Sequence, residues 1–251
     1  MRALRFIPDS IGRLGIGGLQ PIGLGLSYTQ RVQALAPLVY WPLNEVAGTS
    51  GANSVIDYSG NARTGTTANV TFGAAGIGDG NTAATFNGTS AEIAIVSQLQ
   101  PAYAGRVGSF AAWCQVSGAA VWTDSTNREV IRLLVDGSNY IIIRRATTNN
   151  SLEFLYNAGG TTKTVVATLS STAWFHVALT FNKTGDELKA YINGAQVGTT
   201  QTGLGTFTTS NYAGQFIGSG ASGEFWKGNL AHAALFAAVL TDAQIASLAV
   251  V

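Results

Sequence analysis

The acidic residues of this chain are not arranged as a catalytic pair. Cleavage of a glycosidic bond with retention needs two carboxyl groups held about 5–5.5 Å apart. Asp186 and Glu187 are adjacent, so they face opposite sides of a strand or lie in a turn, and Glu153 stands alone. Neither His176 nor His232 has an acid beside it in a recognisable motif. We therefore expect a protein that is not an enzyme.

Sugar binding is the second chemistry that the residue types permit. It needs an aromatic ring exposed for stacking and polar side chains beside that ring. The candidates are Trp122, Asn127, Tyr140 and Trp226. Trp122 lies in a loop-like stretch and is the best platform of the set, although packing of its ring over a sheet edge is at least as good an interpretation.

Cysteine and histidine are too rare for a zinc cluster. The chain has one cysteine and two histidines, so an intrachain disulfide is excluded as well. Cys114 lies in an apolar run, and we interpret it as a small buried hydrophobic residue. His176 lies in a predicted strand, where we expect its imidazole to reach the edge of the sheet rather than a ligand.

The composition indicates a neutral protein with an unusual surface. Of the 251 residues 46% are hydrophobic and 11% are charged, against roughly 25% charged in typical soluble domains. We expect part of the surface to be covered in a homo-oligomer or larger assembly; a neutral, hydrated surface rich in Gly, Ala and Thr is the alternative. The net charge of +1 gives no basis for nucleic acid binding. No apolar run reaches the ~18 residues of a membrane helix, so we expect no membrane insertion.

Short strands must position these residues. From residue 37 onward, runs of β-forming residues alternate with turn signals such as Asn87-Gly88 and Asn193-Gly194, which is typical of a β-sandwich or jelly roll. The predicted strands are 38–43, 83–86, 92–96, 109–116, 129–135, 140–145, 152–157, 163–169, 174–181, 187–192, 215–217 and 225–236. One short helix is predicted near the end, where Thr241 and Gln244 form a capping box.

The first 36 residues differ from the rest of the chain. Glycines are interleaved with apolar residues in a pattern that is neither helical nor strand-like. Such a segment suits docking into a groove or onto an exposed sheet edge. We therefore predict an extended N-terminal anchoring arm, residues 1–36, and a sandwich domain, residues 37–251. The arm residues expected to make the anchoring contacts are Arg5, Ile11, Leu14, Ile16, Leu19 and Ile22.

Several separated motifs agree with one another. They are Leu-Val-Tyr-Trp-Pro-Leu-Asn-Glu at 38–45, Asp-Tyr-Ser-Gly-Asn at 57–61, Ala-Thr-Phe-Asn-Gly at 84–88, Ser-Phe-Ala-Ala-Trp at 109–113, the hairpin at 174–194 and the segment 225–248. As an ordered set they resemble the laminin G-like, concanavalin A-like family. The resemblance implies an all-β fold, a two-sheet antiparallel jelly-roll sandwich with a short C-terminal helix. The Glu-x-Asp-x-x-Glu motif of hydrolases related to this family is absent from the chain.

The resemblance also raises the question of calcium. Family members often place calcium at one rim of the sandwich, and the candidate ligands here are Asp57, Asn61 and Asn87. Many relatives carry acidic residues where this chain has the neutral residues 89–91, which weakens the prediction. For Asp57, an Asx-turn that caps its loop is the favoured alternative. We expect no required cofactor, with calcium as the one optional ion.

Two functions remain open from the sequence. The first is a virion structural, decoration or tail-associated protein of a virus or phage, held to capsid or tail proteins by residues 1–36. Its laminin G-like domain would be displayed for adhesion or for binding a cell-surface glycan. The second is a free extracellular lectin or carbohydrate-binding module, with or without calcium. Both expect a binding function without catalysis.

Overall fold

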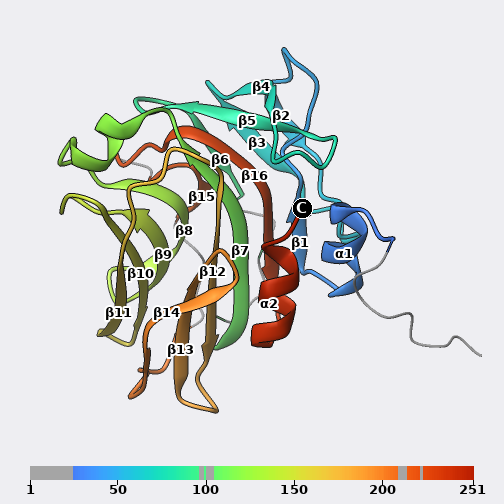
Figure 1. The fold of residues 1–251 in the computed structure, drawn as a ribbon. Coiled ribbons are helices and arrows are strands. Elements are labelled where there is room, and N and C mark those ends of the chain that lie inside the picture. Colours follow the sequence, from blue (N-terminus) through green and yellow to red (C-terminus); the bar gives the residue numbers. More distant parts are fainter. Residues whose placement is uncertain (1–24, 96–98, 100–104, 209–213, 221–222) are drawn as a thin grey trace, which may run out of the picture.

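The computed structural model describes residues 25–95, 99, 105–208, 214–220 and 223–251. Over these residues the chain forms two antiparallel sheets, two short α-helices and one 3-10 helix (Figure 1). The predicted anchoring residues Arg5, Ile11, Leu14, Ile16, Leu19 and Ile22 lie outside the described part of the chain. None of the described helices is long and apolar enough to cross a membrane.

The first sheet, which we call sheet A, has eight strands. In spatial order it contains β14 (Ala195–Gln201), β13 (Glu187–Ile192), β12 (Phe175–Asn182), β7 (Val107–Val116), β16 (Lys227–Phe236), β5 (Thr82–Asn87) and β4 (Thr71–Ala75), with β1 (Val39–Trp41) also paired to β16. Strands β4 and β14 were not predicted, because their Gly-, Ala- and Thr-rich sequences lack a clear apolar alternation.

The second sheet, sheet B, also has eight strands. Its order is β11 (Thr161–Thr168), β10 (Ser151–Ala158), β9 (Asn139–Arg145), β8 (Arg128–Asp136), β15 (Gly214–Ile217), β6 (Glu92–Ala94), β3 (Gly65–Ala68) and β2 (Gly51–Val55). The 3-10 helix η1 (Ala119–Thr123) precedes β8. The predicted two-sheet antiparallel jelly-roll sandwich is confirmed, whereas β2 and β3 were missed.

The core lies between the two sheets. The predicted hairpin is present as β12 and β13, with Asn182 opposite Glu187 across the turn. Its Phe175, Val177 and Leu179 belong to the cluster of buried side chains that fills the space between the sheets. Fully burying each such side chain contributes about 1.5–3 kcal/mol, so this face alone fixes the register of the hairpin.

The outer face of sheet A is covered by two helices, α1 (Tyr28–Ala34) and α2 (Asp242–Leu248) (Figure 1). The predicted capping box of α2 is confirmed: the Thr241 hydroxyl accepts from the backbone of Gln244, whose side chain returns to Thr241. Helix α1 was not predicted. It lies within residues 1–36, which were predicted to be an extended arm, but it is helical and packs on sheet A, so this part of the arm prediction is corrected.

Helix α1 is held by specific contacts as well as by burial. Tyr28 and Val32 are 4% and 1% exposed. The Trp113 indole donates to the Tyr28 hydroxyl at 2.9 Å, and that hydroxyl donates to the Leu248 carbonyl at 2.9 Å. Arg31 Nη1 donates to the Ser247 carbonyl at 3.0 Å. The helix therefore joins sheet A to the C-terminal end of α2.

His176 is placed differently from the prediction. Its side chain is fully buried under the outer face of sheet A, not at a sheet edge, and its ring contacts Trp113 edge-on at 5.4 Å between centroids. Neither ring nitrogen has a hydrogen-bond partner among the described residues. Burial, with a smaller contribution from His232, lowers the pKa of His176 to about 3. The predicted burial of Cys114 is confirmed.

We expect acid to destabilise the fold through His176. Its pKa is depressed in the folded state, so the unfolded chain binds the extra proton first, and stability falls as the pH drops below about 6.5. Between pH 6.5 and 4.5 the loss should be about 2 kcal/mol. Urea unfolding across this range checks the slope, and His176→Leu should flatten it. An unchanged slope in the variant would contradict the assignment to His176.

Candidate functional site

Sheet B carries the candidate site on its outer face, which α1 and α2 do not cover (Figure 1). Cross-strand pairing places Phe216 of β15, Arg132 of β8 and Ile142 of β9 in one row. In the next row Leu134 lies opposite Tyr140. Since directly paired residues of antiparallel strands point to the same face, charged, aromatic and aliphatic side chains alternate across this surface.

These strands surround an open pocket of about 410 Å³, which we call the sheet B pocket. Its aliphatic floor includes Ile142 and Leu155, which are 5% and 7% exposed. Tyr140 lines it and is half-buried, so part of the ring is accessible. Among the described residues, the lining is Arg132, Leu134, Asp136, Gly137, Tyr140, Ile142, Arg144 and Leu155.

Both arginines of the pocket are held by carboxylates. Arg144 donates from Nε to Glu153 Oε2 at 2.9 Å, and its Nη2 lies 2.8 Å from the same oxygen. Arg132 donates from Nε and Nη2 to the two oxygens of Glu129, both at 2.7 Å, and its Nη2 lies 3.2 Å from Glu224 Oε2. Burial raises the pKa of Glu129, and the bonds from Arg132 oppose that shift. The guanidiniums are therefore fixed in orientation.

Of the three aromatic residues predicted to stack on a sugar, one is accessible and two are buried. Tyr140 lies in the sheet B pocket. Trp122 and Trp226 are 1% and 0% exposed, so neither can stack a sugar, and both predictions are corrected. The Trp122 indole donates to the Ser171 carbonyl at 2.8 Å and packs its ring on the core, which is the alternative interpretation.

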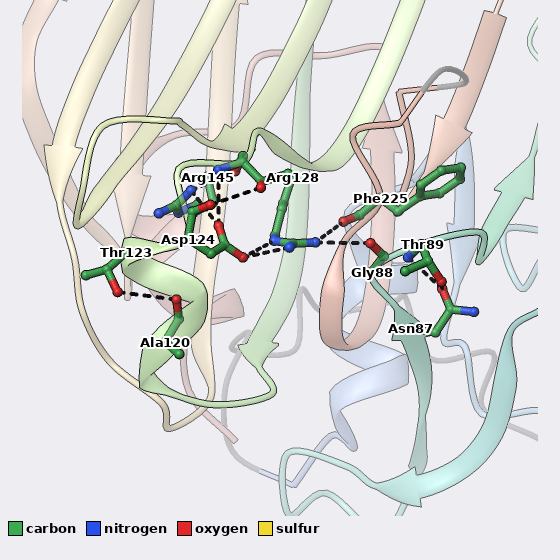
Figure 2. Close-up of polar contacts among 10 residues, drawn as sticks. Asn87, Gly88, Thr89, Ala120, Thr123, Asp124, Arg128, Arg145 and Phe225 are labelled. Carbon is green, nitrogen blue, oxygen red and sulfur yellow. Dashed lines mark hydrogen bonds and ion pairs between the residues drawn. The ribbon is translucent and has the colours of Figure 1, made fainter.

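The rim around Asn127 is a structural network. Figure 2 shows Asp124 between Arg128 and Arg145, whose Nη2 and Nη1 lie 2.6 and 3.0 Å from its two carboxylate oxygens. Arg128 also donates to the carbonyls of Gly88 and Phe225. Asn127 accepts from the backbone of Thr147 at 3.0 Å. These contacts hold the loop to the sandwich and bring Asn127 into no pocket lining described above.

The candidate calcium ligands do not fit a metal. Asp57 Oδ1 accepts from the backbone amides of Tyr40 and Ser59, and Oδ2 accepts from the Ser59 hydroxyl and the Arg63 amide, at 2.8–2.9 Å. Asn61 donates its Nδ2 to the Leu38 carbonyl at 3.0 Å.

Asn87 is occupied in the same way. Its Oδ1 accepts from the backbone amides of Thr89, Ser90 and Ala91. No group of three or more His, Cys, Asp or Glu side chains suited to a metal is found in the described part of the chain. The side-chain oxygens of Asp57 and Asn87 therefore accept from protein donors, and for Asp57 this is the Asx-turn interpretation.

A buried cluster of an aspartate, a histidine and a tyrosine was not predicted from the sequence. His232 Nε2 lies 3.1 Å from Asp79 Oδ2, and Nδ1 lies 2.7 Å from the Tyr40 hydroxyl. Burial opposes ionisation of Asp79, but hydrogen bonds from His232 and Asn81 hold its pKa well below the usual range. His232 and Tyr40 are 1% and 0% exposed. These buried contacts join β1, β16 and the loop between β4 and β5, so we assign the cluster a structural role.

Two other pockets carry less of what a sugar site needs. The pocket beside α2, about 430 Å³, contains Tyr191, but that ring is 1% exposed. The pocket formed by residues 44–58, about 400 Å³, contains the accessible ring of Tyr58 but one charged residue, Glu45, among its described lining. The sheet B pocket alone among the three combines an accessible ring with several fixed charged groups.

The two packed antiparallel sheets and the open pocket on one of them define a lectin-like jelly-roll domain. A laminin G-like family model, described as the concanavalin A-like lectin/glucanases superfamily, matches residues 88–246, and the chain belongs to this family. No curated protein sequence matches the chain significantly.

Solved structures share the fold at low identity. Domain 4 of AbnA, a GH43 extracellular arabinanase from Geobacillus stearothermophilus, solved in complex with arabinotriose, has a TM-score of 0.61 and 17% identity, covering 85% of this chain and 98% of that domain. The binding domain of botulinum neurotoxin serotype D has a TM-score of 0.64 and 14% identity over 89% of this chain. The chain spans about half the length of that toxin domain, 52%.

Proposed function

We propose that this protein is a non-catalytic carbohydrate-binding domain and that the sheet B pocket is its binding site. The single observation that carries the proposal is the placement of Tyr140 beside Arg132 and Arg144 over an aliphatic floor. A pyranose or furanose ring has an apolar face of C–H groups and an equator of hydroxyls. Such a ligand fits an accessible aromatic ring flanked by fixed hydrogen-bonding groups.

The ion pairs of the pocket suit hydroxyl recognition. Arg144 and Glu153 are held to each other, so their remaining N–H groups and lone pairs point in fixed directions. A sugar hydroxyl donates one hydrogen bond and accepts others, so a fixed pair of donor and acceptor can satisfy it at a low ordering cost. The domain from the arabinanase, solved with arabinotriose, supports the same class of ligand for this fold.

The absence of catalysis is part of the proposal. Glu129 and Glu153, the carboxylates nearest the pocket arginines, are each bonded to a guanidinium. Glu129 is fully buried, and neither carboxylate belongs to the described lining of the pocket, so neither is placed to donate a proton to a leaving group there. No further group in the described pocket lining supplies an acid for that step, because Asp136 is the only carboxylate there and hydrogen bonds from Asn139 and Ser138 hold its pKa below the usual range.

We expect Tyr140→Ala to weaken glycan binding about tenfold. Loss of one sugar–aromatic stack removes roughly 1–1.5 kcal/mol, and 1.4 kcal/mol is a factor of ten in affinity. A glycan array that includes arabinotriose identifies a ligand, and titration calorimetry then compares the variant with the parent protein. Because the candidate calcium ligands are occupied by protein donors, a chelator should leave the affinity unchanged.

Tyr58→Ala is the matched control. Tyr58 is another accessible tyrosine, 39% exposed, in a different pocket. Its loss should leave binding intact. If binding is lost with Tyr58→Ala and kept with Tyr140→Ala, the site is the pocket of residues 44–58 and the proposal for sheet B is wrong. Silence on every glycan would overturn the carbohydrate-binding function itself.

We also propose that the glycine-rich residues before α1 anchor this domain to a larger assembly, such as other capsid or tail proteins of a virion or further copies of the chain. The low charged fraction and the apolar residues between the glycines support this proposal. An extracellular lectin free in solution is the alternative location and needs no anchor. The truncations described in the Discussion separate the two.

A further inference from the structure

We infer that the sheet B pocket selects neutral saccharides and rejects uronates and other acidic sugars. The inference rests on the proposed carbohydrate-binding function and adds the chemical class of the ligand. An acidic sugar is normally gripped by an arginine whose Nε and Nη2 groups donate in parallel to the two oxygens of the ligand carboxylate. The two arginines of the pocket are the groups that would do so here.

Both arginines have that edge already occupied. Arg144 donates from Nε to Glu153, with Nη2 in ion-pair contact with the same oxygen, and Arg132 donates from Nε and Nη2 to Glu129. The other edge of Arg132 is engaged as well, since its Nη2 also lies 3.2 Å from Glu224 Oε2, and a carboxylate that approached the remaining end of Arg144 would lie close to the negative charge of Glu153. A ligand carboxylate would have to displace a protein carboxylate from a bond as short as 2.7 Å.

The charge around the pocket points the same way. Glu129 and Glu224 contact Arg132, Glu153 contacts Arg144, and Asp136 also lines the pocket, so carboxylates outnumber arginines. These groups are partly shielded from water: the Glu129 side chain is 0% exposed and the Arg132 side chain 16%. Screening by salt is weaker for partly buried charges than for exposed ones. An anionic ligand therefore meets net repulsion where a neutral one meets none.

The test compares ligands that differ in one group. A neutral galacto-oligosaccharide and the galacturono-oligosaccharide of the same length and linkage differ only in carrying CH₂OH or a carboxylate at C6. The same comparison uses glucose and glucuronate oligomers, and arabinotriose serves as a further neutral probe. Titration calorimetry at 50 and 300 mM NaCl should give affinities for the neutral member at least tenfold higher than for its acidic partner.

Glu153→Gln tests the cause. This variant keeps the size of the side chain, removes one negative charge and weakens the hold on the guanidinium of Arg144, because an amide oxygen is a weaker acceptor than a carboxylate. We expect the ratio of its affinity for the uronate oligomer to its affinity for the neutral oligomer to rise about five- to tenfold, more at low salt. Glu187→Gln, an exposed site on β13, is the control that changes net charge equally and should alter neither affinity. Thermal unfolding confirms that both variants are folded, and Glu224→Gln replaces Glu153→Gln if needed.

The outcomes separate this inference from the proposed function. Uronate binding by the parent protein equal to or tighter than neutral binding would overturn the inference and leave carbohydrate binding standing. An unchanged ratio in Glu153→Gln, or an equal rise in Glu187→Gln, would remove the assigned cause and also overturn it. If no neutral or acidic oligosaccharide binds at all, the proposed function fails and this inference fails with it.

Discussion

Asp57→Ala should lower the free energy of unfolding by about 3–5 kcal/mol, which for a chain of this length corresponds to a fall in Tm of roughly 10 °C. The carboxylate is 9% exposed and accepts four hydrogen bonds, three of them from the backbone amides of Tyr40, Ser59 and Arg63. Removing it leaves these donors without an acceptor. Each orphaned buried donor costs about 1–3 kcal/mol, less where water can enter.

Thermal and urea unfolding of matched variants check this prediction. Asp57→Asn keeps one acceptor oxygen and should lie between the parent and Asp57→Ala. Asp136→Ala removes a comparable turn carboxylate at an exposed site, and its effect should be much smaller. The competing interpretation, a calcium site at Asp57, predicts that calcium raises the Tm of the parent and that Asp57→Ala removes this increase. A calcium-dependent Tm would contradict the structural role proposed for Asp57.

Removing residues 1–36 should destabilise the domain by at least about 5 kcal/mol, whereas removing residues 1–24 should leave its stability unchanged. The longer deletion removes α1, with the buried side chains of Tyr28 and Val32 at about 1.5–3 kcal/mol each. It also leaves the Trp113 indole and the Leu248 carbonyl without the Tyr28 hydroxyl, at about 1–3 kcal/mol for each orphaned group.

The same two truncations test the anchoring proposal. If residues before α1 hold the domain in an assembly, the 1–24 deletion should be a well-folded monomer by light scattering while the full chain is larger. A full chain that is itself monomeric and binds no partner would favour the free lectin. If the 1–36 deletion unfolds at the same urea concentration as the full chain, α1 contributes nothing and the predicted boundary at residue 36 was correct after all.

The fold was predictable where the alternation of residue types in the sequence matches the two-residue repeat of a β-strand. The predicted strands 174–181 and 187–192 alternate cleanly and are present as the paired strands β12 and β13. Helix α1 was missed even though Ser27 and Gln30 form the same capping box as Thr241 and Gln244. The glycines before Ser27 suggested a continuous arm. A helix of seven residues spans only about two turns, so its apolar pattern was too short to outweigh the glycines.

The site was predictable only in part, because burial of an aromatic ring depends on distant contacts. Trp122 was predicted in a loop-like stretch but lies in the 3-10 helix η1 and is buried, and its indole donates to the Ser171 carbonyl 49 residues away. Tyr140 was identified as a candidate, but its neighbours were not. Arg132 and Arg144 could have been found from the alternation of β8 and β9, because the hairpin between them brings every second residue to one face.

Helix α1 gives the molecule a mechanical polarity. Arg31 bonds the carbonyls of Ser247 and Val250, so the chain entering at residue 25 is tied at once to its other end. A pull applied through the N-terminal residues would load this junction and sheet A before any other part. The residues that line the sheet B pocket belong to the other sheet of the sandwich. Tension that enters through α1 would thus act first on sheet A, while the pocket is built on sheet B.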